Sequence, residues 1–306
     1  MANPAPVSHL ARPREDNAGK GIALMLTAYL LFSFTDTSVK WLSLAGIPAM
    51  QLAFMRFGVH LALSTGPMLG RDHSGWTAPR AQAALMLLRG GLLLVSTSTN
   101  FIALRYLDLT VVAAIQFSSP ILVCALSVPL LGERVGPWRW GAIVLGFLGV
   151  LIVVRPWSAE FHPAAMLSVI SATSLALFSI LTRRLAGVAA PRTMQLYGGL
   201  VGTVVLLPVA IWVWQAPVTP IDWGLMFAVG LFAWSGHHFF SRAHGYAPAS
   251  VLMPFSYSFL IYLAISGFLV FGTVPDVMTL TGAAVIALAG LTIWWRERPV
   301  RRAARS

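Results

Sequence analysis

A unit of about 140 residues is written twice in this chain, and this internal repeat restricts the possible folds more than any other feature of the sequence. The matched positions lie 140 residues apart, or 141 at the last pair. They are Ala103 and Ala243, Tyr106 and Tyr246, Thr110 and Ser250, Val111 and Val251, Gly132 and Gly272, and Gly149 and Gly290. The chain is therefore expected to fold as two copies of one structural unit.

The composition places both copies in a membrane. Hydrophobic residues make up 57% of the 306 residues, charged residues only 10%, and the mean hydropathy is +0.76. So few charged side chains cannot cover a soluble globule of this size. A membrane-spanning helix needs about 20 mostly apolar residues. Ten segments meet this requirement: 21–43, 48–69, 81–103, 108–131, 137–154, 163–183, 191–214, 222–241, 248–271 and 277–295.

The basic residues indicate how these ten spans are oriented, because cytosolic loops of membrane proteins are enriched in Lys and Arg. With the N-terminus inside, cytosolic segments hold 16 of the 21 basic residues, and the outer ends hold three, Lys40, Arg105 and Arg155. We therefore expect a multi-pass protein of the inner membrane with both termini in the cytoplasm. This distribution also accounts for the net charge of +11 without a nucleic-acid partner.

Five spans per copy is an odd number, so the second copy must enter the membrane from the opposite side. The expected units are a disordered cytosolic tail over 1–20, a first five-helix repeat over 21–155, a second, inverted five-helix repeat over 162–295, and a basic cytosolic tail over 296–306. Inverted repeats are the architecture of secondary transporters, which bind substrate near the midplane between the copies. A receptor or a membrane enzyme has no need of such a repeat.

Two groups of residues form a pattern that resembles a known family. Span 4 opens with Ala103-x-x-Tyr106-x-Asp108, contains Pro120 and closes with Leu131-Gly132-Glu133, and span 5 continues with Trp140-Gly141 through Gly149. The first two spans hold Asp36-x-x-x-Lys40 and Gln51-x-x-Phe54-x-Arg56. With these motifs the chain resembles the EamA type of the drug/metabolite transporter superfamily over about residues 20 to 295. The resemblance implies a metabolite transporter in which spans 1–4 and 6–9 surround a central cavity.

The second copy departs from this pattern at the turn after its fourth span. Thr273 stands there in the place of Glu133. Any role of the Glu133 carboxylate therefore belongs to one half only, either as a cap of a tight cytosolic turn or as part of an ion pair at an inner gate.

Ionisable side chains inside the spans are the first candidates for a substrate site, because a membrane interior disfavours them strongly. In span 1, Tyr29, Ser33, Asp36 and Lys40 recur every three or four residues and share one helical face. Asp36 and Arg56 lie about 10 and 12 Å from the same surface at about 1.5 Å per residue, so they are expected to pair. Such a pair either locks two helices together or serves a substrate or proton.

Spans 2 and 3 add further candidates. His60 follows Arg56 by one turn near the midplane, where it suits either a proton-coupled step or a hydrogen bond within the bundle. Arg89, Ser96 and Asn100 share a face that either lines a cavity or bonds to neighbouring helices. An arginine in a cavity favours a carboxylate or phosphate on the substrate, whereas an arginine that snorkels to the inner interface does not inform on the substrate.

Polar, aromatic and proline residues mark three later spans as possible walls of the cavity. A proline inside a span frees a backbone carbonyl, so it either lines a cavity or forms a packing kink. The aromatic and histidine side chains of span 8 are expected to form cavity walls. The candidates are Gln116 and Pro120 in span 4, Trp234 and His237 in span 8, and Pro254 and Tyr257 in span 9.

The sequence predicts neither a metal site nor a cofactor. The single cysteine, Cys124, lies in an apolar run, and the histidines of span 8 have no carboxylate or cysteine near them. Neither a phosphate-binding loop nor a nucleophile with a base at motif spacing is present. The expected partners are a small-molecule substrate and the lipid bilayer, and the oligomeric state is left open.

Three functions follow from these observations. The first is a secondary transporter that moves an amino-acid-like, aromatic or vitamin-like metabolite by alternating access, with or without proton coupling. Because Asp36, Lys40 and Arg56 occur together in one branch of the family, an importer of riboflavin or S-adenosylmethionine type compounds is the second, and direction stays open. The third is a membrane enzyme that acts on a lipid through His60 or His237 with Asp36, although such an enzyme needs its polar groups at the interface.

Overall fold

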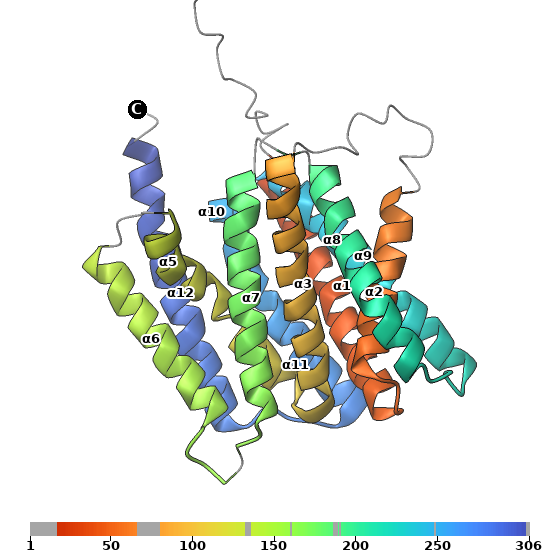
Figure 1. Ribbon diagram of the computed structural model, residues 1–306. Coiled ribbons are helices and arrows are strands. Elements are labelled where there is room, and N and C mark those ends of the chain that lie inside the picture. Colours follow the sequence, from red (N-terminus) through yellow and green to blue (C-terminus); the bar gives the residue numbers. More distant parts are fainter. Residues whose placement is uncertain are drawn as a thin grey trace, which may run out of the picture.

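The computed structural model is a helical bundle, and its described residues contain no strand (Figure 1). The structure describes residues 17–65, 80–131, 136–159, 161–185, 189, 191–247 and 249–303. The helices are α1 (Ala18–Leu44), α2 (Ala49–Thr65), α3 (Arg80–Tyr106), α4 (Leu109–Gln116), α5 (Ser119–Leu131), α6 (Pro137–Val154), α7 (Ala164–Leu185), α8 (Pro191–Val213), α9 (Pro220–Tyr246), α10 (Ala249–Leu252), the 3-10 helix η3 (Met253–Tyr257), α11 (Ser258–Phe271) and α12 (Val277–Ala303).

These helices overlap the apolar segments that the sequence defines. Five stretches are long and apolar enough to cross a membrane: Ala18–Leu44, Gln82–Tyr106, Leu109–Leu126, Ala164–Thr182 and Thr193–Val213. Trp140–Val154, Phe255–Phe271 and Val277–Thr292 are shorter apolar helices. Most of the tail predicted over 1–20 lies outside the described residues, and α12 continues to Ala303 into the predicted C-terminal tail.

The bundle has an apolar exterior and a polar interior. Large apolar side chains are widely exposed on its surface, including Trp212 (87%) and Leu269 (73%). In contrast, Lys40, Gln51 and Arg89 are buried. An apolar surface of this extent fits lipid rather than water, because a monomeric soluble protein exposes only limited apolar patches.

Two of the predicted spans are broken near their middle. The span expected over 108–131 is interrupted at Phe117–Ser118, between α4 and α5. Pro120 explains this break, since proline lacks the N–H that would bond to the carbonyl of Gln116 and disfavours a helical residue before it. The span expected over 248–271 is interrupted in the same way by η3, which contains Pro254.

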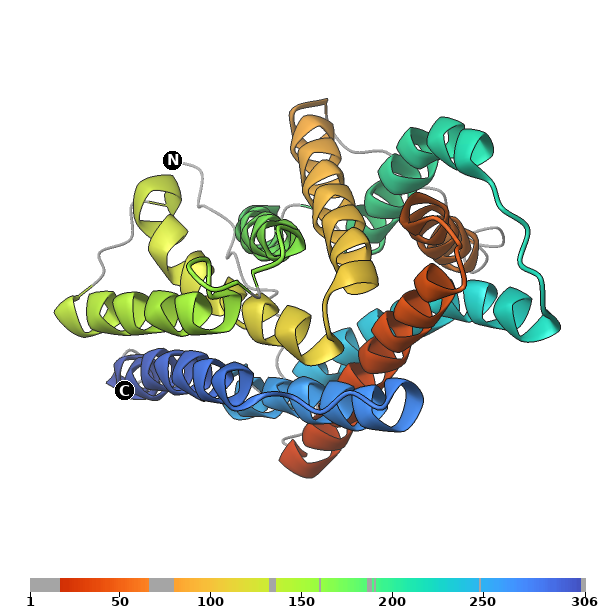
Figure 2. The same cartoon turned by 90° about the horizontal axis from the view of Figure 1, so that it is seen from below.

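The helices pack as four prominent pairs: α1 with α9, α3 with α7, α2 with α8, and α6 with α12. The last pair lies side by side along one edge of the molecule (Figure 2). Its helices approach so closely that a Cβ atom on Gly149 would lie 3.0 Å from the carbonyl oxygen of Gly282. A Cβ on Gly282 would lie 2.8 Å from the carbonyl oxygen of Gly149, so glycine is required at this crossing.

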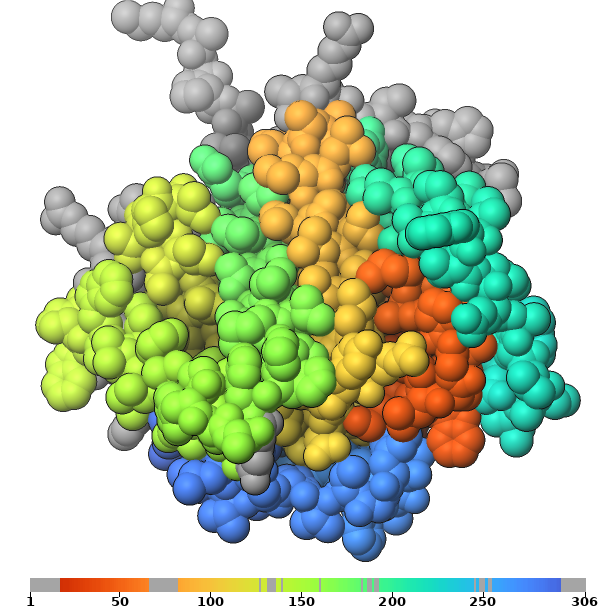
Figure 3. All heavy atoms as spheres, turned by 60° about the horizontal axis from the view of Figure 1, so that its bottom comes forward, coloured from red at the N-terminus to blue at the C-terminus, as the bar shows by residue number. Residues whose placement is uncertain are grey.

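The two ends of the bundle differ in the segments that form them. At the end drawn lowest in Figure 1 lie the connections between α1 and α2, α6 and α7, and α11 and α12. We call it the lower end; segments from both halves of the chain meet there (Figure 3). The C-terminal part of α12 lies at the opposite, upper end.

Candidate functional site

A small cavity lies inside the bundle between α2, α3, α8 and α9. Its polar lining consists of Arg56 and His60 from α2, Arg89 from α3, Gln195 from α8 and His237 from α9. Arg89 is 5% exposed and His60 is 8% exposed. Charged and titratable side chains thus converge at a point that the apolar exterior separates from lipid.

Arg56 and His60 project into this cavity one helical turn apart. The Nη1 atom of Arg56 donates a hydrogen bond of 2.8 Å to the hydroxyl of Thr97 on α3. The Nε2 atom of His60 is joined by a hydrogen bond of 3.0 Å to Gln195 Oε1 on α8. At the cavity, α2 is thus bonded to α3 in the first half of the chain and to α8 in the second.

Arg89 is held by the second half of the chain rather than by the inner interface. Its Nε atom donates to Thr182 Oγ1 at 2.6 Å, and its Nη1 atom donates to the carbonyl oxygen of Met194 at 2.9 Å. Its guanidinium also lies 4.1 Å from the ring centre of Phe178. Arg89 is thus a buried side chain that both lines the cavity and bonds to two neighbouring helices.

His237 and Trp234 point in different directions, although the sequence predicts both as cavity walls. The His237 ring lies 5.0 Å from the ring of Phe32 and 6.1 Å from the ring of His60. Trp234 instead stacks on His238, with ring centres 5.6 Å apart. His238 is exposed, Trp234 is half-buried one turn before it on α9, and neither lines the cavity.

A second group of polar side chains lies next to the cavity, on α1, α3, α4 and α7. The amide nitrogen of Gln116 donates to Asn100 Oδ1 at 3.0 Å and to Ser171 Oγ at 2.6 Å. Ser171 in turn donates to the carbonyl oxygen of Ser96 at 2.8 Å. The Asp36 carboxylate lies near the Asn100 side chain, and its charge interacts with that of Arg56. We call Asp36, Arg56, His60, Arg89, Ser96, Asn100, Gln116, Ser171, Gln195 and His237 the central cluster.

The expected ion pair between Asp36 and Arg56 is not formed. Both residues belong to the described part of the chain, and no contact within ion-pair distance joins them. Arg56 turns to α3, where it meets Thr97, and Asp36 turns to Asn100 on the same helix. Their charges interact across a larger distance, with α3 supplying the polar groups for both.

Several other predicted residues do not line this cavity. The Ser33 hydroxyl donates to the carbonyl oxygen of Leu30 in its own helix, and the Tyr29 ring packs among Phe32, Phe240 and Phe259. The Tyr257 hydroxyl donates to the carbonyl oxygen of Ala287 on α12 at 3.2 Å. Pro120 is exposed, the side chain of Pro254 is not described, and Glu133 lies outside the described residues.

Four side chains at the cavity and its polar neighbourhood were missed by the sequence reasoning. All come from α3 or from the second half of the chain, and each is a polar residue within an apolar segment, which is the signal that could have found them. They are Thr97, Ser171, Thr182 and Gln195.

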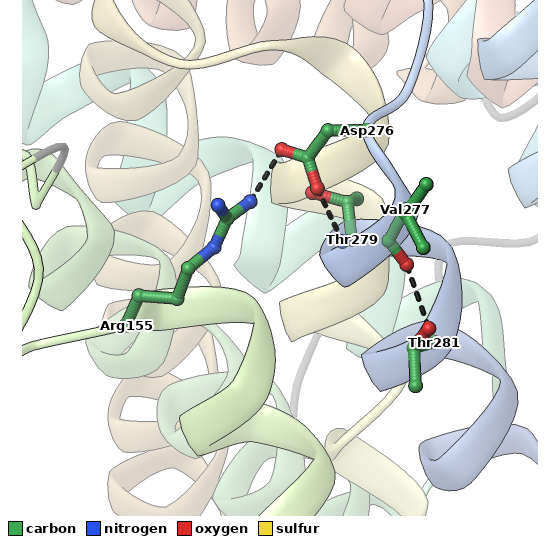
Figure 4. A network of polar contacts seen from close by, with 5 residues as sticks. All are labelled: Arg155, Asp276, Val277, Thr279 and Thr281. Atoms are coloured by element: carbon green, nitrogen blue, oxygen red, sulfur yellow. Dashed lines mark hydrogen bonds and ion pairs between the residues drawn. The ribbon is translucent and has the colours of Figure 1, made fainter.

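A separate polar network ties the two halves together at the lower end. Lys40 Nζ donates to the carbonyl oxygen of Leu107 at 2.6 Å and lies 3.8 Å from the Asp108 carboxylate. Gln51 exchanges two hydrogen bonds with the backbone of Gln215, at 2.8 and 2.9 Å. Trp41 donates to Asp222, and Arg155 pairs with Asp276 (Figure 4). These contacts are called the lower-end network below.

Asp276 is the most peripheral acid of the lower-end network. Its carboxylate accepts a hydrogen bond of 2.7 Å from the backbone N–H of Thr279 as well as the contact from Arg155. Partial burial raises the pKa of Asp276, but the Thr279 and Arg155 contacts outweigh it and hold the pKa below its usual range. The charged form of Asp276 is therefore the form that this turn favours.

Comparison with known proteins identifies relatives along almost the whole chain. The model of the EamA-like transporter family matches residues 19–155 and again residues 162–295. The chain is 29% identical to a riboflavin transporter of Vibrio cholerae, over 92% of this chain and 96% of the relative. It is 27% identical to an S-adenosylmethionine uptake transporter of Rickettsia felis, over 91% and 93%.

Two further matches extend this comparison. A pseudopaline exporter of Pseudomonas aeruginosa is 26% identical, over 89% of this chain and 95% of the exporter. A protein of known crystal structure superimposes with a TM-score of 0.63 and 17% identity, over 92% of this chain and 99% of that chain. The structural match shows that the fold is shared.

Proposed function

The chain belongs to the EamA-like transporter family and is a small-molecule transporter of the membrane, and from this premise we propose that it works as a secondary transporter with alternating access. In the proposed architecture ten membrane spans form two inverted five-helix repeats, residues 21–155 and 162–295. Both termini face the cytoplasm at the inner membrane, as the distribution of basic residues favours. The lower end then faces outward.

Equivalent helix contacts in the two halves support the inverted repeat. If α7 is the counterpart of α1 and α9 that of α3, the pair of α1 with α9 corresponds to the pair of α7 with α3, and both are prominent. In the other two pairs, α2 with α8 and α6 with α12, each helix packs against its own counterpart in the other half. A two-fold arrangement of this kind is what inverted repeats produce.

Single residues follow the same symmetry. Phe117 and Tyr257 are separated by the repeat distance, and their rings lie 5.1 Å apart at the two helix breaks. Tyr106 stacks on His162 just before α7, with ring centres 5.2 Å apart. Its counterpart Tyr246 lies beneath Lys20 near the start of α1, at 4.4 Å. Equivalent tyrosines thus contact the beginning of the opposite half.

The observation that carries the transport mechanism is the central cluster, which is polar and receives side chains from both halves of a bundle with an apolar exterior. The first half supplies Asp36, Arg56 and Arg89, and the second supplies Ser171 and Gln195. A site between two repeats is reached from either side when the repeats rock against each other. The central cluster is therefore the proposed substrate site.

The proposed substrate is a small organic metabolite of amino-acid-like, aromatic or vitamin-like type. The buried Oε1 atom of Gln116 has no hydrogen-bond partner among the described residues, so it suits a donor on such a substrate. At the cavity, His237 and the neighbouring Phe32 supply aromatic surface. Similarity to relatives named for riboflavin and S-adenosylmethionine supports this class, and import is the alternative form of the same proposal.

Proton coupling is proposed to run through Asp36, with His60 as a second group. A carboxyl group inside a membrane bundle is a common proton carrier in transporters. Asp36 has a neutral amide neighbour, Asn100, and only a distant positive charge, so it can take up a proton without breaking an ion pair. This arrangement favours a carrier over a structural lock.

The test is transport by the purified protein in liposomes. A panel of amino acids, flavins, nucleosides and sulfonium compounds is offered under imposed pH and voltage gradients, and both uptake and efflux are measured. Asn100→Leu and Gln116→Leu are expected to reduce transport, whereas Thr99→Val, whose hydroxyl bonds within its own helix, is the matched control. If no compound moves while an added lipid is chemically converted, transport is not the activity.

A further inference from the structure

We propose that Arg56 binds an anionic group of the transported molecule, a carboxylate or a phosphate, in the cavity between α2, α3, α8 and α9. Arg89 adds positive charge to the same cavity wall. This inference rests on the proposed transport function and names a substrate class for the same site. The reasons are the missing counter-ions, the hydrogen-bonding state of the two arginines and the neutral groups around them.

The first reason is the supply of carboxylates. The described side chains include four of them, and three belong to the lower-end network, where Asp108 meets Lys40, Asp222 meets Trp41, and Asp276 meets Arg155. Only Asp36 lies near the cavity, and it forms no ion pair with either arginine in the described part of the chain. The guanidinium groups of Arg56 and Arg89 thus have one described carboxylate near them, and neither is in ion-pair contact with it.

The second reason is the difference between Arg56 and Arg89. Arg89 donates to Thr182 and to the carbonyl oxygen of Met194, and its guanidinium lies over the ring of Phe178. Arg56 donates only to Thr97 among the described residues, and its guanidinium lies 5.1 Å from the ring centre of Phe57. Arg89 is therefore fixed in place, while Arg56 retains N–H groups for a ligand.

The third reason is the chemistry of the rest of the wall. His60, Gln195 and His237 provide neutral hydrogen-bonding groups, and Gly198 and Gly199 bring the α8 backbone to the cavity without side chains. A Cβ atom on Gly198 would meet its nearest neighbour, Leu93, at 3.7 Å. A planar guanidinium with free N–H groups, flanked by neutral donors, is suited to a carboxylate or phosphate.

The charges of the central cluster lead to the same conclusion. With Arg56 and Arg89 charged and Asp36 ionised, the cluster carries one excess positive charge. An isolated charge inside a membrane protein is costly unless it is paired. One monovalent anion neutralises the cluster, so an anionic substrate is favoured over its uncharged analogue in the occluded cavity.

The experiment compares matched compounds that differ in the anionic group. The pairs are S-adenosylmethionine and its decarboxylated form, flavin mononucleotide and riboflavin, and phenylalanine and phenethylamine. Binding to the full-length protein is measured by ligand-dependent thermal stabilisation. In at least one pair the anionic member is expected to bind about tenfold to a hundredfold more tightly, as charged hydrogen bonds do.

Variants assign this preference to Arg56. Arg56→Gln is expected to remove it, and Arg56→Lys to retain it at lower affinity, because lysine keeps the charge but loses the planar fork. Arg105→Gln, at an exposed arginine at the end of α3, is the matched control and is expected to keep the wild-type preference. If Arg56→Gln does not fold, the reduced affinity of Arg56→Lys for the anionic compounds still tests the proposal.

Two results would overturn the proposal while leaving transport intact. One is that both members of every pair bind equally, or that only uncharged compounds are transported. The other is that Arg56→Gln weakens both members of a pair by the same factor, which indicates a structural role. A wild-type protein that transports nothing in the liposome panel instead contradicts the proposed function itself.

Discussion

The central cluster and the lower-end network use the same kinds of side chain in opposite ways. At the lower end, Lys40 and Arg155 each meet a carboxylate, and the amide nitrogen and oxygen of Gln51 are both bonded to backbone. In the central cluster, Arg56 and Arg89 meet only neutral acceptors. Polar groups that are satisfied within the protein hold it together, whereas polar groups with spare capacity are available to a ligand.

The largest effect that would test this contrast is expected from Asp36→Asn. The substitution keeps the shape of the side chain but removes the proposed proton carrier and the one carboxylate of the central cluster. Uptake driven by a pH gradient is expected to fall by about a hundredfold, while the thermal midpoint changes little because no ion pair is lost. Initial uptake rates at several pH values check this. Wild-type rates with an unchanged pH profile would rule out proton transfer at Asp36.

Lys40→Met is expected to have the opposite effect, with a large change in thermal stability and a small change in uptake. It removes the ammonium group that bonds to the carbonyl oxygen of Leu107 and faces Asp108. A hydrogen bond from a charged donor contributes about 1.5–3 kcal/mol, so the thermal midpoint in detergent is expected to fall clearly. Arg105→Gln removes an exposed basic residue at the same end and serves as the control. An unchanged midpoint for Lys40→Met would show that the network does not stabilise the protein.

Gln51→Leu sharpens the comparison, because it removes no charge. Its two hydrogen bonds to Gln215 join the first half of the chain to the second. The loss of stability is expected to be about 1–2 kcal/mol, measured as a shift of the thermal midpoint. Gln82→Leu on α3, outside both polar groups, is the matched control. Equal shifts in both variants would contradict a specific role of the Gln51 contact.

The smallest effect is expected at Asp276, which is half exposed. Its pKa is depressed in the folded protein, so its contribution to stability is complete above its ordinary pKa of about 4 and is lost as the pH falls through the lower folded value. Asp276→Asn is therefore expected to reduce stability slightly at neutral pH and to converge with the wild type in acid. Thermal midpoints between pH 7 and pH 3 measure this; parallel curves would contradict it.

The positions of the helices could be predicted to within a few residues, because long apolar segments bounded by turn signals define them. α1, α6 and α8, for example, lie where 21–43, 137–154 and 191–214 were expected. The break before α5 follows from the chemistry of Pro120, although its place at Phe117–Ser118 was not predicted. These features depend on neighbours in the sequence, which is why the sequence contains them.

The partners of the polar side chains could not be predicted in the same way. Helical spacing gives the face of Arg56, but only the packing of α2 against α3 decides that it meets Thr97 rather than Asp36. His237 and His238 are adjacent in the sequence, yet His237 lines the cavity and His238 stacks on Trp234. Such choices depend on contacts between segments far apart in the chain.

The charges of the central cluster have a consequence for the resting state of the transporter. Asp36, Arg56 and Arg89 all come from the first half, and the second half has no described charged counterpart in this cluster. In the inverted repeat proposed above, two identical halves would make the inward-facing and outward-facing forms equal in energy. In the proposed mechanism, the residues that the duplication does not copy therefore set the preference of the empty protein for one side of the membrane, before any substrate is bound.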